Sequence, residues 1–322
     1  MEVEVSTCRN LARILSGLEI EEEKFVDPRF FPSPGDDPEH VARYFFFMVA
    51  IDHRTRTRGH SYGETVEGEY LEGSELLYRL GAKRYEEGVE MFSPEKMARI
   101  SAGEVKEWLS YGSAEIRDPD VRAYLLRDCA LKLLALYKGS VLRLLGESTG
   151  VLYAGIGGGL IERLKVFRAY EDPVEKKSFL LVKFLARRGL FEPRDREKLQ
   201  VAVDNHLTRV AVRTGMLVAE GRELELFTRA RRASYEEDVV VRMYARIAYK
   251  IVARESGLDP LLLDDVVWSI GRGCCKEEGA ECDTGRVAAL RARGCPLRTA
   301  CRAYSEPRLK KLVEHELETW YY

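Results

Sequence analysis

The fold is decided by the stretch Val201-Ala202-Val203-Asp204-Asn205-His206-Leu207-Thr208-Arg209-Val210-Ala211-Val212-Arg213-Thr214-Gly215. Asp204 belongs to the residue types that cap helix N-termini, because its side-chain oxygen can accept a hydrogen bond from a backbone N–H of the first turn. Leu207, Val210 and Ala211 follow at three- and four-residue spacing, which is typical of the buried face of a helix. The stretch therefore predicts a helix that begins at Asp204.

Most other long segments show the same helical spacing of apolar residues. Residues 121–145 and 236–255 are the longest examples. Alternating, strand-like stretches are short. The best of them is 45–51, and even this segment can be read as buried helix. The sequence thus predicts an all-α architecture.

Length and composition indicate a globular protein. The chain has 322 residues, of which 45% are hydrophobic and 32% charged, enough for one large domain or two smaller ones. No apolar run approaches the roughly 20 residues needed to span a bilayer, and the acidic start Met1-Glu2-Val3-Glu4 does not resemble a signal peptide. We therefore expect a cytoplasmic protein with no membrane association. The scarcity of Asn and Gln, against abundant Arg and Glu, suggests a thermophilic source.

The net charge of −2 does not by itself indicate a nucleic-acid partner. Residues 226–254 nevertheless contain seven arginine and lysine residues. Such a segment can bind phosphates locally on a nearly neutral protein, or it can be an ordinary solvated helix face.

Five of the seven cysteines fall between residues 274 and 301. From Cys275 the spacing is Cys275-x6-Cys282-x12-Cys295-x5-Cys301. Four thiolates in one loop can bind the four irons of a [4Fe–4S] cluster. Zinc is the alternative, although the two-to-four-residue spacing of zinc knuckles is missing. Disulfides or free thiols are a third reading.

The remaining cysteines have simpler interpretations. Cys274 is a spare residue beside the first expected ligand, and Cys8 and Cys129 are expected in the core.

The run Gly271-Arg272-Gly273-Cys274-Cys275, followed by x6-Cys, resembles the cluster loop of the endonuclease III family. In that family a helix ends in Gly-Arg before a Cys-x6-Cys-x2-Cys-x5-Cys array. The closing stretch 295–301 is similar to that of the related adenine glycosylases. The middle gap is ten residues longer here, and an insertion between the second and third ligands can bulge outward without moving the ligands.

The stretch around Asp204 resembles the Val-Asp-x-His-x-x-Arg-Val-x-x-Arg-Thr segment of the same family. The resemblance implies that Asp204 is the catalytic carboxylate. Cleavage of an N-glycosidic bond builds positive charge on the sugar, and a negative group beneath the ring stabilises that state or activates the attacking water or amine. His206 follows as a capping or packing residue, or as a residue that contacts substrate.

Bifunctional members of the superfamily also use a lysine that attacks the sugar and forms a Schiff base. The segment 175–183 resembles the lysine-bearing helix of archaeal 8-oxoguanine DNA glycosylases, which implies Lys176 as the nucleophile and Lys177 as the second choice. A solvated surface lysine is the competing reading. The glycine hairpin of endonuclease III is absent, and Gly155–Gly159 is either a turn or a loop whose backbone approaches a phosphate.

The N-terminal half resembles the queuosine salvage proteins, which are helix-hairpin-helix-like nucleosidases. Residues 45–52 are similar to their aromatic-rich segment ending in Asp, and residues 73–78, 86–89, 138–141 and 166–168 have looser counterparts in the same order. This resemblance implies Phe46 and Asp52, together with His206, as substrate-binding residues.

Together the resemblances imply a two-subdomain helix-hairpin-helix glycosylase-like fold. Residues 1–268 would form the helical region with a cleft between its subdomains, residues 269–305 an iron–sulfur loop, and residues 306–322 a C-terminal helix. The expected function is a monomeric DNA glycosylase, with or without lyase activity, that excises a damaged purine from DNA. A nucleosidase that releases a modified base from a nucleoside or nucleotide is the alternative, and a non-catalytic iron–sulfur DNA-binding protein is the third.

Overall fold

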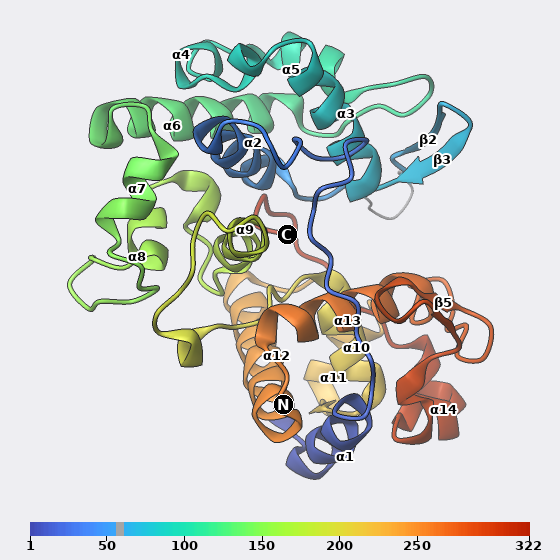
Figure 1. Cartoon of the computed structure of the whole chain (residues 1–322). Coiled ribbons are helices and arrows are strands. Elements are labelled where there is room, and N and C mark those ends of the chain that lie inside the picture. The colour runs from blue at the N-terminus through green and yellow to red at the C-terminus, as the bar shows by residue number, and fades with distance from the viewer. Residues whose placement is uncertain (56–60) are drawn as a thin grey trace. The chain divides into compact units, whose positions relative to one another are not determined.

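The structure is a computed structural model that describes residues 1–55 and 61–322. Its contacts divide the chain into two units, and each is described by itself (Figure 1). The first unit consists of Met1–Glu23 and Leu199–Thr319, and the second of Lys24–Lys198 and Trp320–Tyr322. Both are built mainly from helices, so the mostly α-helical fold is confirmed. In the described ranges the strands form only two-stranded antiparallel sheets.

The first unit is built around helix α10 and the longer helices α12 and α13. Its helices are α1 (Val5–Leu15), α10 (Asn205–Thr214), α11 (Gly221–Phe227), α12 (Tyr235–Ser256), α13 (Pro260–Gly273) and α14 (Arg302–Ser305), with 3-10 turns η4 (Ala288–Leu290), η5 (Pro296–Thr299) and η6 (Pro307–Lys311). Strand β1 (Glu2–Val3) pairs with β4 (Leu217–Val218), and β5 (Arg286–Val287) pairs with β6 (Ala292–Arg293).

Helix α10 forms as the sequence predicts. Leu207, Val210 and Ala211 are buried in the core of the first unit, together with apolar residues of α1, α12 and α13. The predicted helix over 236–255 is also confirmed, because α12 begins one residue earlier and ends one residue later. Ser234 caps it through a capping box with Glu237.

The second unit surrounds the buried helix α2. Its helices are α2 (Pro38–Ile51), α3 (Ser74–Glu86), α4 (Pro94–Met97), α5 (Ala102–Leu109), α6 (Pro119–Tyr137), α7 (Val141–Glu147), α8 (Leu160–Leu164) and α9 (Lys176–Arg187), with 3-10 turns η1 (Val89–Phe92), η2 (Arg168–Tyr170) and η3 (Arg196–Lys198). A hairpin joins strands β2 (Gly63–Val66) and β3 (Glu69–Glu72).

The best strand candidate of the sequence, 45–51, is helical. It forms the C-terminal half of α2, in which every residue from Tyr44 to Ile51 is buried. A helix buried on all sides shows no polar face, so its apolar residues cannot reveal a helical period. Asp37 caps α2 through the N–H of Glu39, and Pro38 occupies the first turn.

The expected helix over 121–145 is two helices, α6 and α7. The chain breaks where Lys138 and Gly139 adopt positive φ angles of 53° and 75°. Ser140 then caps α7 by accepting a hydrogen bond from the N–H of Arg143.

The prediction of a C-terminal helix over 306–322 is wrong. Only the turn η6 is helical, and from Leu312 the chain has no regular secondary structure. Its backbone is bound by the loops around α11, since the N–H of Val313 donates to the carbonyl of Phe227 and the carbonyl of Glu316 accepts from the N–H of Ala233. These contacts replace the hydrogen bonds that a helix would have made.

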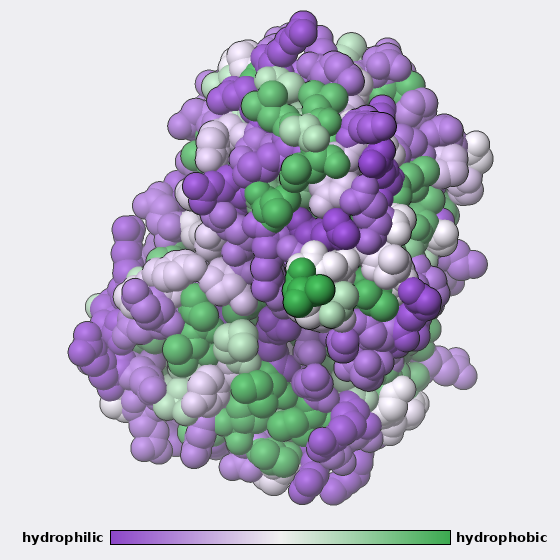
Figure 2. Space-filling view, turned by 90° about the vertical axis from the view of Figure 1, so that its left-hand side faces the viewer, coloured by the Kyte–Doolittle hydropathy of each residue, from purple (hydrophilic) through white to green (hydrophobic). Residues whose placement is uncertain are grey.

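The face of the molecule seen in Figure 2 is mostly hydrophilic, with separate apolar areas between charged residues. Within the part of the chain that the structure describes, no helix has both the length and the apolarity needed to cross a membrane.

Candidate active site

Asp204 is the N-cap of α10, as the sequence predicts. Its backbone is extended (φ −102°, ψ −165°), and its Oδ1 accepts a hydrogen bond of 2.9 Å from the N–H of Leu207. Its carbonyl oxygen begins the helix by accepting from the N–H of Thr208. The N-terminal end of a helix carries partial positive charge, so a carboxylate is a favourable cap at this position.

The Asp204 carboxylate is partly exposed, and no ion pair joins it to another described residue. Two buried arginines, Arg209 and Arg242, each already form an ion pair with another carboxylate. Arg209 pairs with Glu314 at 2.6 Å, and Arg242 pairs with Asp238 at 2.8 Å. The negative charge of Asp204 is therefore available to a positive charge that develops on a bound substrate.

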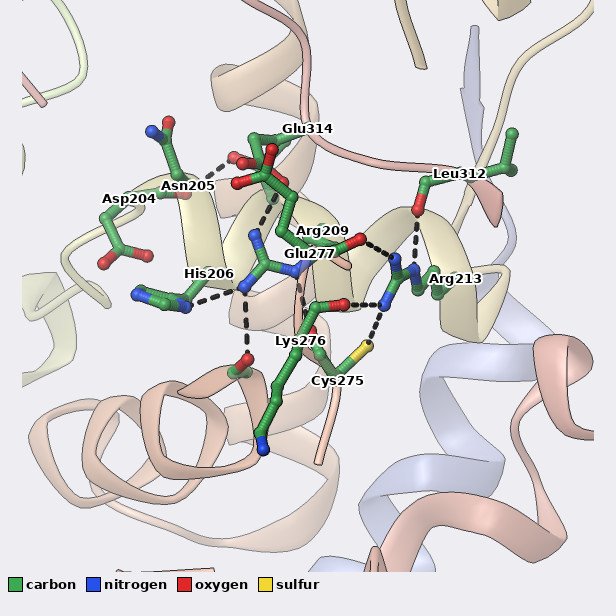
Figure 3. A network of polar contacts seen from close by, with 12 residues as sticks. Asp204, Asn205, His206, Arg209, Arg213, Cys275, Lys276, Glu277, Leu312 and Glu314 are labelled. Atoms are coloured by element: carbon green, nitrogen blue, oxygen red, sulfur yellow. Dashed lines mark hydrogen bonds and ion pairs between the residues drawn. The ribbon is translucent and has the colours of Figure 1, made fainter. Parts of the chain in front are cut away.

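His206 lies at the same end of α10 as the Asp204 carboxylate (Figure 3). Its ring packs edge-to-face on Trp268, with 5.9 Å between ring centroids. Its Nδ1 lies 2.8 Å from an Nη of Arg209. Desolvation and the charge of Arg209 lower the pKa of His206, while the charge of Asp204 opposes this shift.

Arg209 is almost completely buried and spreads its donors over four residues (Figure 3). Besides Glu314 and His206, it donates to the carbonyl oxygen of Cys275 at 2.6 Å and to that of Gly271 at 3.1 Å. One side chain thus joins α10 to the end of α13, to the cysteine loop and to the C-terminal segment.

Arg213, one helical turn further along α10, binds the start of the cysteine loop (Figure 3). It donates to the carbonyl oxygens of Lys276, Glu277 and Leu312, and one Nη lies 3.5 Å from the sulfur of Cys275. A guanidinium beside a thiolate stabilises the charged form of the sulfur.

The insertion between Cys282 and Cys295 forms the β5–β6 hairpin. At its base the N–H of Cys295 donates to the carbonyl oxygen of Cys282 at 2.7 Å, and Gly294 donates to Gly285. The long gap therefore leaves the two cysteines adjacent. The insertion does not extend freely outward, because Val287 is fully buried and the hairpin contacts α13.

All seven cysteines are free thiols, so the disulfide reading finds no support. Cys8 and Cys129 are fully buried core residues, as expected. In the loop, burial raises the pKa of the Cys282 thiol; the charge of Lys310 opposes this rise, and that of Cys275 adds to it. Burial and the charge of Cys275 raise the pKa of Cys301 to about 11. Burial also raises the pKa of Cys295, with a smaller contribution from the charges of Cys274, Cys275 and Cys301.

The charge of Cys275 acts on the thiols of Cys282, Cys295 and Cys301. Among the described residues, no group of three or more cysteine, histidine or acidic side chains is arranged to hold a metal ion. Thiols are the ligands of iron–sulfur clusters, and the four cysteines are free in this structure.

The lysines of α9 are not solvated surface charges. Lys176, Lys177 and Lys183 are 7%, 0% and 6% exposed. The ammonium of Lys177 donates to the carbonyl oxygen of Ala50 at 2.7 Å and lies 3.3 Å from Nδ1 of His53. Burial, and then the charges of Lys176 and Arg122, lower the pKa of Lys177 well below its ordinary value.

Lys176 and Lys177 share a buried cap. The carboxylate of Asp172 accepts from both of their backbone N–H groups, at 2.9 and 3.4 Å. Burial raises the pKa of Asp172 to about 6, although these hydrogen bonds and the two lysine charges oppose the rise.

The two substrate-binding residues expected from the N-terminal half have different surroundings. Phe46 is fully buried, and its ring stacks on that of Tyr170 with 5.4 Å between centroids. A ring so enclosed belongs to the core, which argues against contact with substrate. Asp52 is partly exposed at the end of α2, and its carbonyl oxygen accepts from Nζ of Lys176 at 3.3 Å.

The glycine loop Gly155–Gly159 is a turn closed by an acidic residue. The carboxylate of Glu162 accepts hydrogen bonds from the N–H groups of Ala154 and Gly159, at 2.9 and 2.8 Å. The backbone donors that a phosphate would use are thus bound to a carboxylate within the chain, which favours the turn reading. Ile156 is fully exposed at the tip with a φ of 44°.

Sequence reasoning did not identify Glu314, His315, Asp172 or His53. Glu314 and His315 are buried, and His315 lies 2.6 Å from the Asp238 carboxylate. The predicted C-terminal helix over 306–322 suggested no partner for these two residues. The adjacent Glu and His in this charged segment were the only signal that they pair with other side chains. Asp172 lies four residues before Lys176, the first residue of α9, and is followed by a proline. This pattern could have suggested that Asp172 caps the helix.

No family model matches the chain, and no curated protein compared with it gives a match.

Proposed function

We propose that the chain is an N-glycosidase of the helix-hairpin-helix DNA-glycosylase superfamily, with Asp204 as its catalytic carboxylate. One observation carries the proposal. Asp204 is a partly exposed N-cap at the start of a buried helix, and none of the described residues pairs with it as a counter-charge. A carboxylate held in this way by its own helix is fixed in position, with one oxygen bound to the helix N-terminus.

The charge has a direct use in base release. As the glycosidic bond breaks, electrons leave with the base and positive charge develops on the sugar. A fixed carboxylate stabilises that state at little reorganisation cost, or removes a proton from the attacking water. The products are the free base and a sugar hydroxyl at C1′.

The leading substrate is a damaged purine in DNA. An enzyme that acts on a base within a duplex must extrude it, and apolar side chains commonly fill or wedge open the stack. Ile156 has this character, since it is fully exposed on a turn that Glu162 braces by two hydrogen bonds. A β-branched residue at positive φ is uncommon, and such strain is found at functional sites.

The second candidate is a nucleosidase that acts on a free modified nucleoside or nucleotide. The feature that favours it is the polar end of α2, where the backbone carbonyls of Ala50 and Asp52 bind Lys177 and Lys176. This end is the part of the N-terminal half that resembles the queuosine salvage proteins. A free nucleoside needs no wedge.

Ile156→Ala separates the two substrates. On the DNA reading it lowers base release from duplex by roughly tenfold or more, and it leaves release from a free nucleoside unchanged. Leu131→Ala is the matched control, because Leu131 is also an exposed apolar residue of the second unit. Equal rates for Ile156→Ala and wild type on duplex would show that Ile156 is not a wedge, and release from free nucleosides without release from duplex would support the nucleosidase.

A lyase step would require a neutral amine. The pKa of Lys177 is depressed, but its side chain is 0% exposed, so, like Phe46, it belongs to the core and does not reach a substrate. Lys176, the first choice from the sequence, is 7% exposed and is the nucleophile we propose for this step. Its neutral amine would attack C1′ and displace the base. Borohydride trapping on a damaged duplex is the test, with an adduct expected in wild type and Lys177→Gln and lost in Lys176→Gln. Base release without any adduct would identify a monofunctional enzyme that uses water.

The cofactor we propose is a [4Fe–4S] cluster held by Cys275, Cys282, Cys295 and Cys301, with zinc as the alternative. The support is the resemblance of the cysteine spacing, the four free thiols, the hairpin base that brings Cys282 beside Cys295, and the contact between Arg213 and Cys275. A bound cluster would supply four iron–thiolate bonds that hold the loop.

The proposed function is tested by incubating the purified protein with lesion-bearing duplexes and with free modified nucleosides, and by identifying the released base by mass. Release of a free base from either class supports an N-glycosidase. Binding of damaged DNA without release of any base would support the non-catalytic alternative.

A further inference from the structure

Arg209 makes a contact that determines where His206 carries its proton. A guanidinium has only donors, whereas each nitrogen of a neutral imidazole is either a donor or an acceptor. The Nη of Arg209 lies 2.8 Å from Nδ1 of His206, so Nδ1 must accept. The proton of a neutral ring is then on Nε2.

The contact is held from several sides. Arg209 is 2% exposed, and its remaining donors bind the carboxylate of Glu314 and the carbonyl oxygens of Cys275 and Gly271. Its guanidinium therefore cannot turn away without breaking buried hydrogen bonds. The ring of His206 is held by Trp268 and by the main chain of Gly271, where an added Cβ would lie 2.7 Å from the Cβ of His206.

The same arrangement disfavours a charged imidazole. A doubly protonated ring would turn a donor at Nδ1 toward the donors of Arg209. The charges that act on the ring are those of Asp204 and Glu314, which favour a proton, and those of Arg209 and Arg272, which oppose it. A cationic His206 would also neutralise part of the Asp204 charge that base release uses.

We propose that Arg209 is a positioning residue that keeps His206 neutral and protonated at Nε2, so that an N–H donor, and not a cation, lies beside the Asp204 carboxylate. This inference rests on the proposed function only in its effect on base release. The tautomer itself is a property of the protein without substrate.

The test is nitrogen NMR of the protein with 15N-labelled histidine, assigned by the loss of one ring signal in His206→Gln. We expect His206 of wild type at pH 7 to show an unprotonated Nδ1 and a protonated Nε2. In Arg209→Lys, which keeps the positive charge but loses the planar set of donors, the Nδ1–H form should appear. A protonated Nδ1 in wild type, as the other tautomer or as imidazolium, would overturn the proposal.

Kinetics then separate this inference from the proposed function. We expect Arg209→Lys to lower kcat roughly tenfold with little change in KM, and His206→Gln, whose amide can donate from the position of Nε2, to retain more activity than His206→Leu. Glu314→Gln keeps a partner for Arg209 and should retain the wild-type tautomer. Full activity of Asp204→Asn would refute the proposed function but would not affect the tautomer of His206 measured by NMR. A proton on Nδ1 of His206 in wild type would refute only the role of Arg209.

Discussion

The N–H of Cys295 donates to the carbonyl oxygen of Cys282 at 2.7 Å, although twelve residues separate the two cysteines. The hairpin between them closes at its base and packs its apolar residues onto α13. An unusually long gap in the cysteine array is therefore compatible with one ligand set, because the gap is folded and does not separate its ends.

The cysteine loop should bind iron. We expect the protein purified without oxygen to contain about four irons per chain, and substitution of Cys275, Cys282, Cys295 or Cys301 by serine to abolish the visible absorption of the thiolate-bound iron. Cys274→Ser is the matched control, because Cys274 is a neighbouring cysteine outside the proposed ligand set. Elemental analysis that finds one zinc and no iron would favour the alternative metal.

The glycine at the end of α13 is required by a backbone contact. A Cβ on Gly273 would lie 1.7 Å from the carbonyl oxygen of Arg286, whereas a Cβ on Gly279 would meet nothing within 4 Å. Gly273→Ala should therefore lower the free energy of unfolding by about 2 kcal/mol or more, despite the better helix propensity of alanine. Gly279→Ala should leave the denaturation midpoint unchanged, and equal midpoints for the two variants would contradict the close approach.

The buried ion pair of the C-terminal segment should be important for stability. Glu314 is 4% exposed and pairs with the buried Arg209, so Glu314→Ala leaves a buried cation without its main partner. We expect a loss of about 3 kcal/mol in chemical denaturation. Glu316→Ala removes a more exposed carboxylate 3.9 Å from Arg232 and should cost less than about 1 kcal/mol. Similar losses in the free energy of unfolding for both variants would contradict a stabilising role of the Glu314–Arg209 ion pair.

Asp172 should make stability fall as pH rises. Its folded-state pKa is raised to about 6 from the usual 3.8, so below about pH 4 the group is protonated in both states and has no effect. Between pH 4 and 6 the unfolded chain releases the proton first, and stability is lost until the folded state has also ionised. In Asp172→Asn this fall should be absent from the melting temperature measured against pH. A variant whose pH profile runs parallel to that of wild type would contradict the raised pKa.

The sequence predicted those parts of the fold that local patterns determine. The cap at Asp204 and the buried face of α10 follow from residue types within one helical turn, and α12 follows from its periodicity. The C-terminal segment could not be predicted in this way, since the partners of Glu314 and His315 lie about 75 to 105 residues away in the chain.

The surroundings of the lysines in α9 could not be predicted from local patterns either. The spacing of Lys176 and Lys177 indicates only that they point in different directions. Their environments depend on where α2 ends, because Ala50 and Asp52 supply the carbonyl oxygens that bind the two ammonium groups. Likewise, the fold-back of the hairpin depends on the surface of α13, although the apolar run from Val287 to Leu290 was a signal that it packs against the core.

The catalytic role of Asp204 is tested by the rate of base release by Asp204→Asn, compared with wild type on the substrate found among the lesion-bearing duplexes and free modified nucleosides. The asparagine keeps a side-chain oxygen to cap α10 at the N–H of Leu207, so the melting temperature should stay close to that of wild type. We predict that base release falls by roughly a hundredfold or more because the charge is lost. A folded Asp204→Asn that releases base within about threefold of the wild-type rate would contradict the assignment of Asp204 as the catalytic carboxylate.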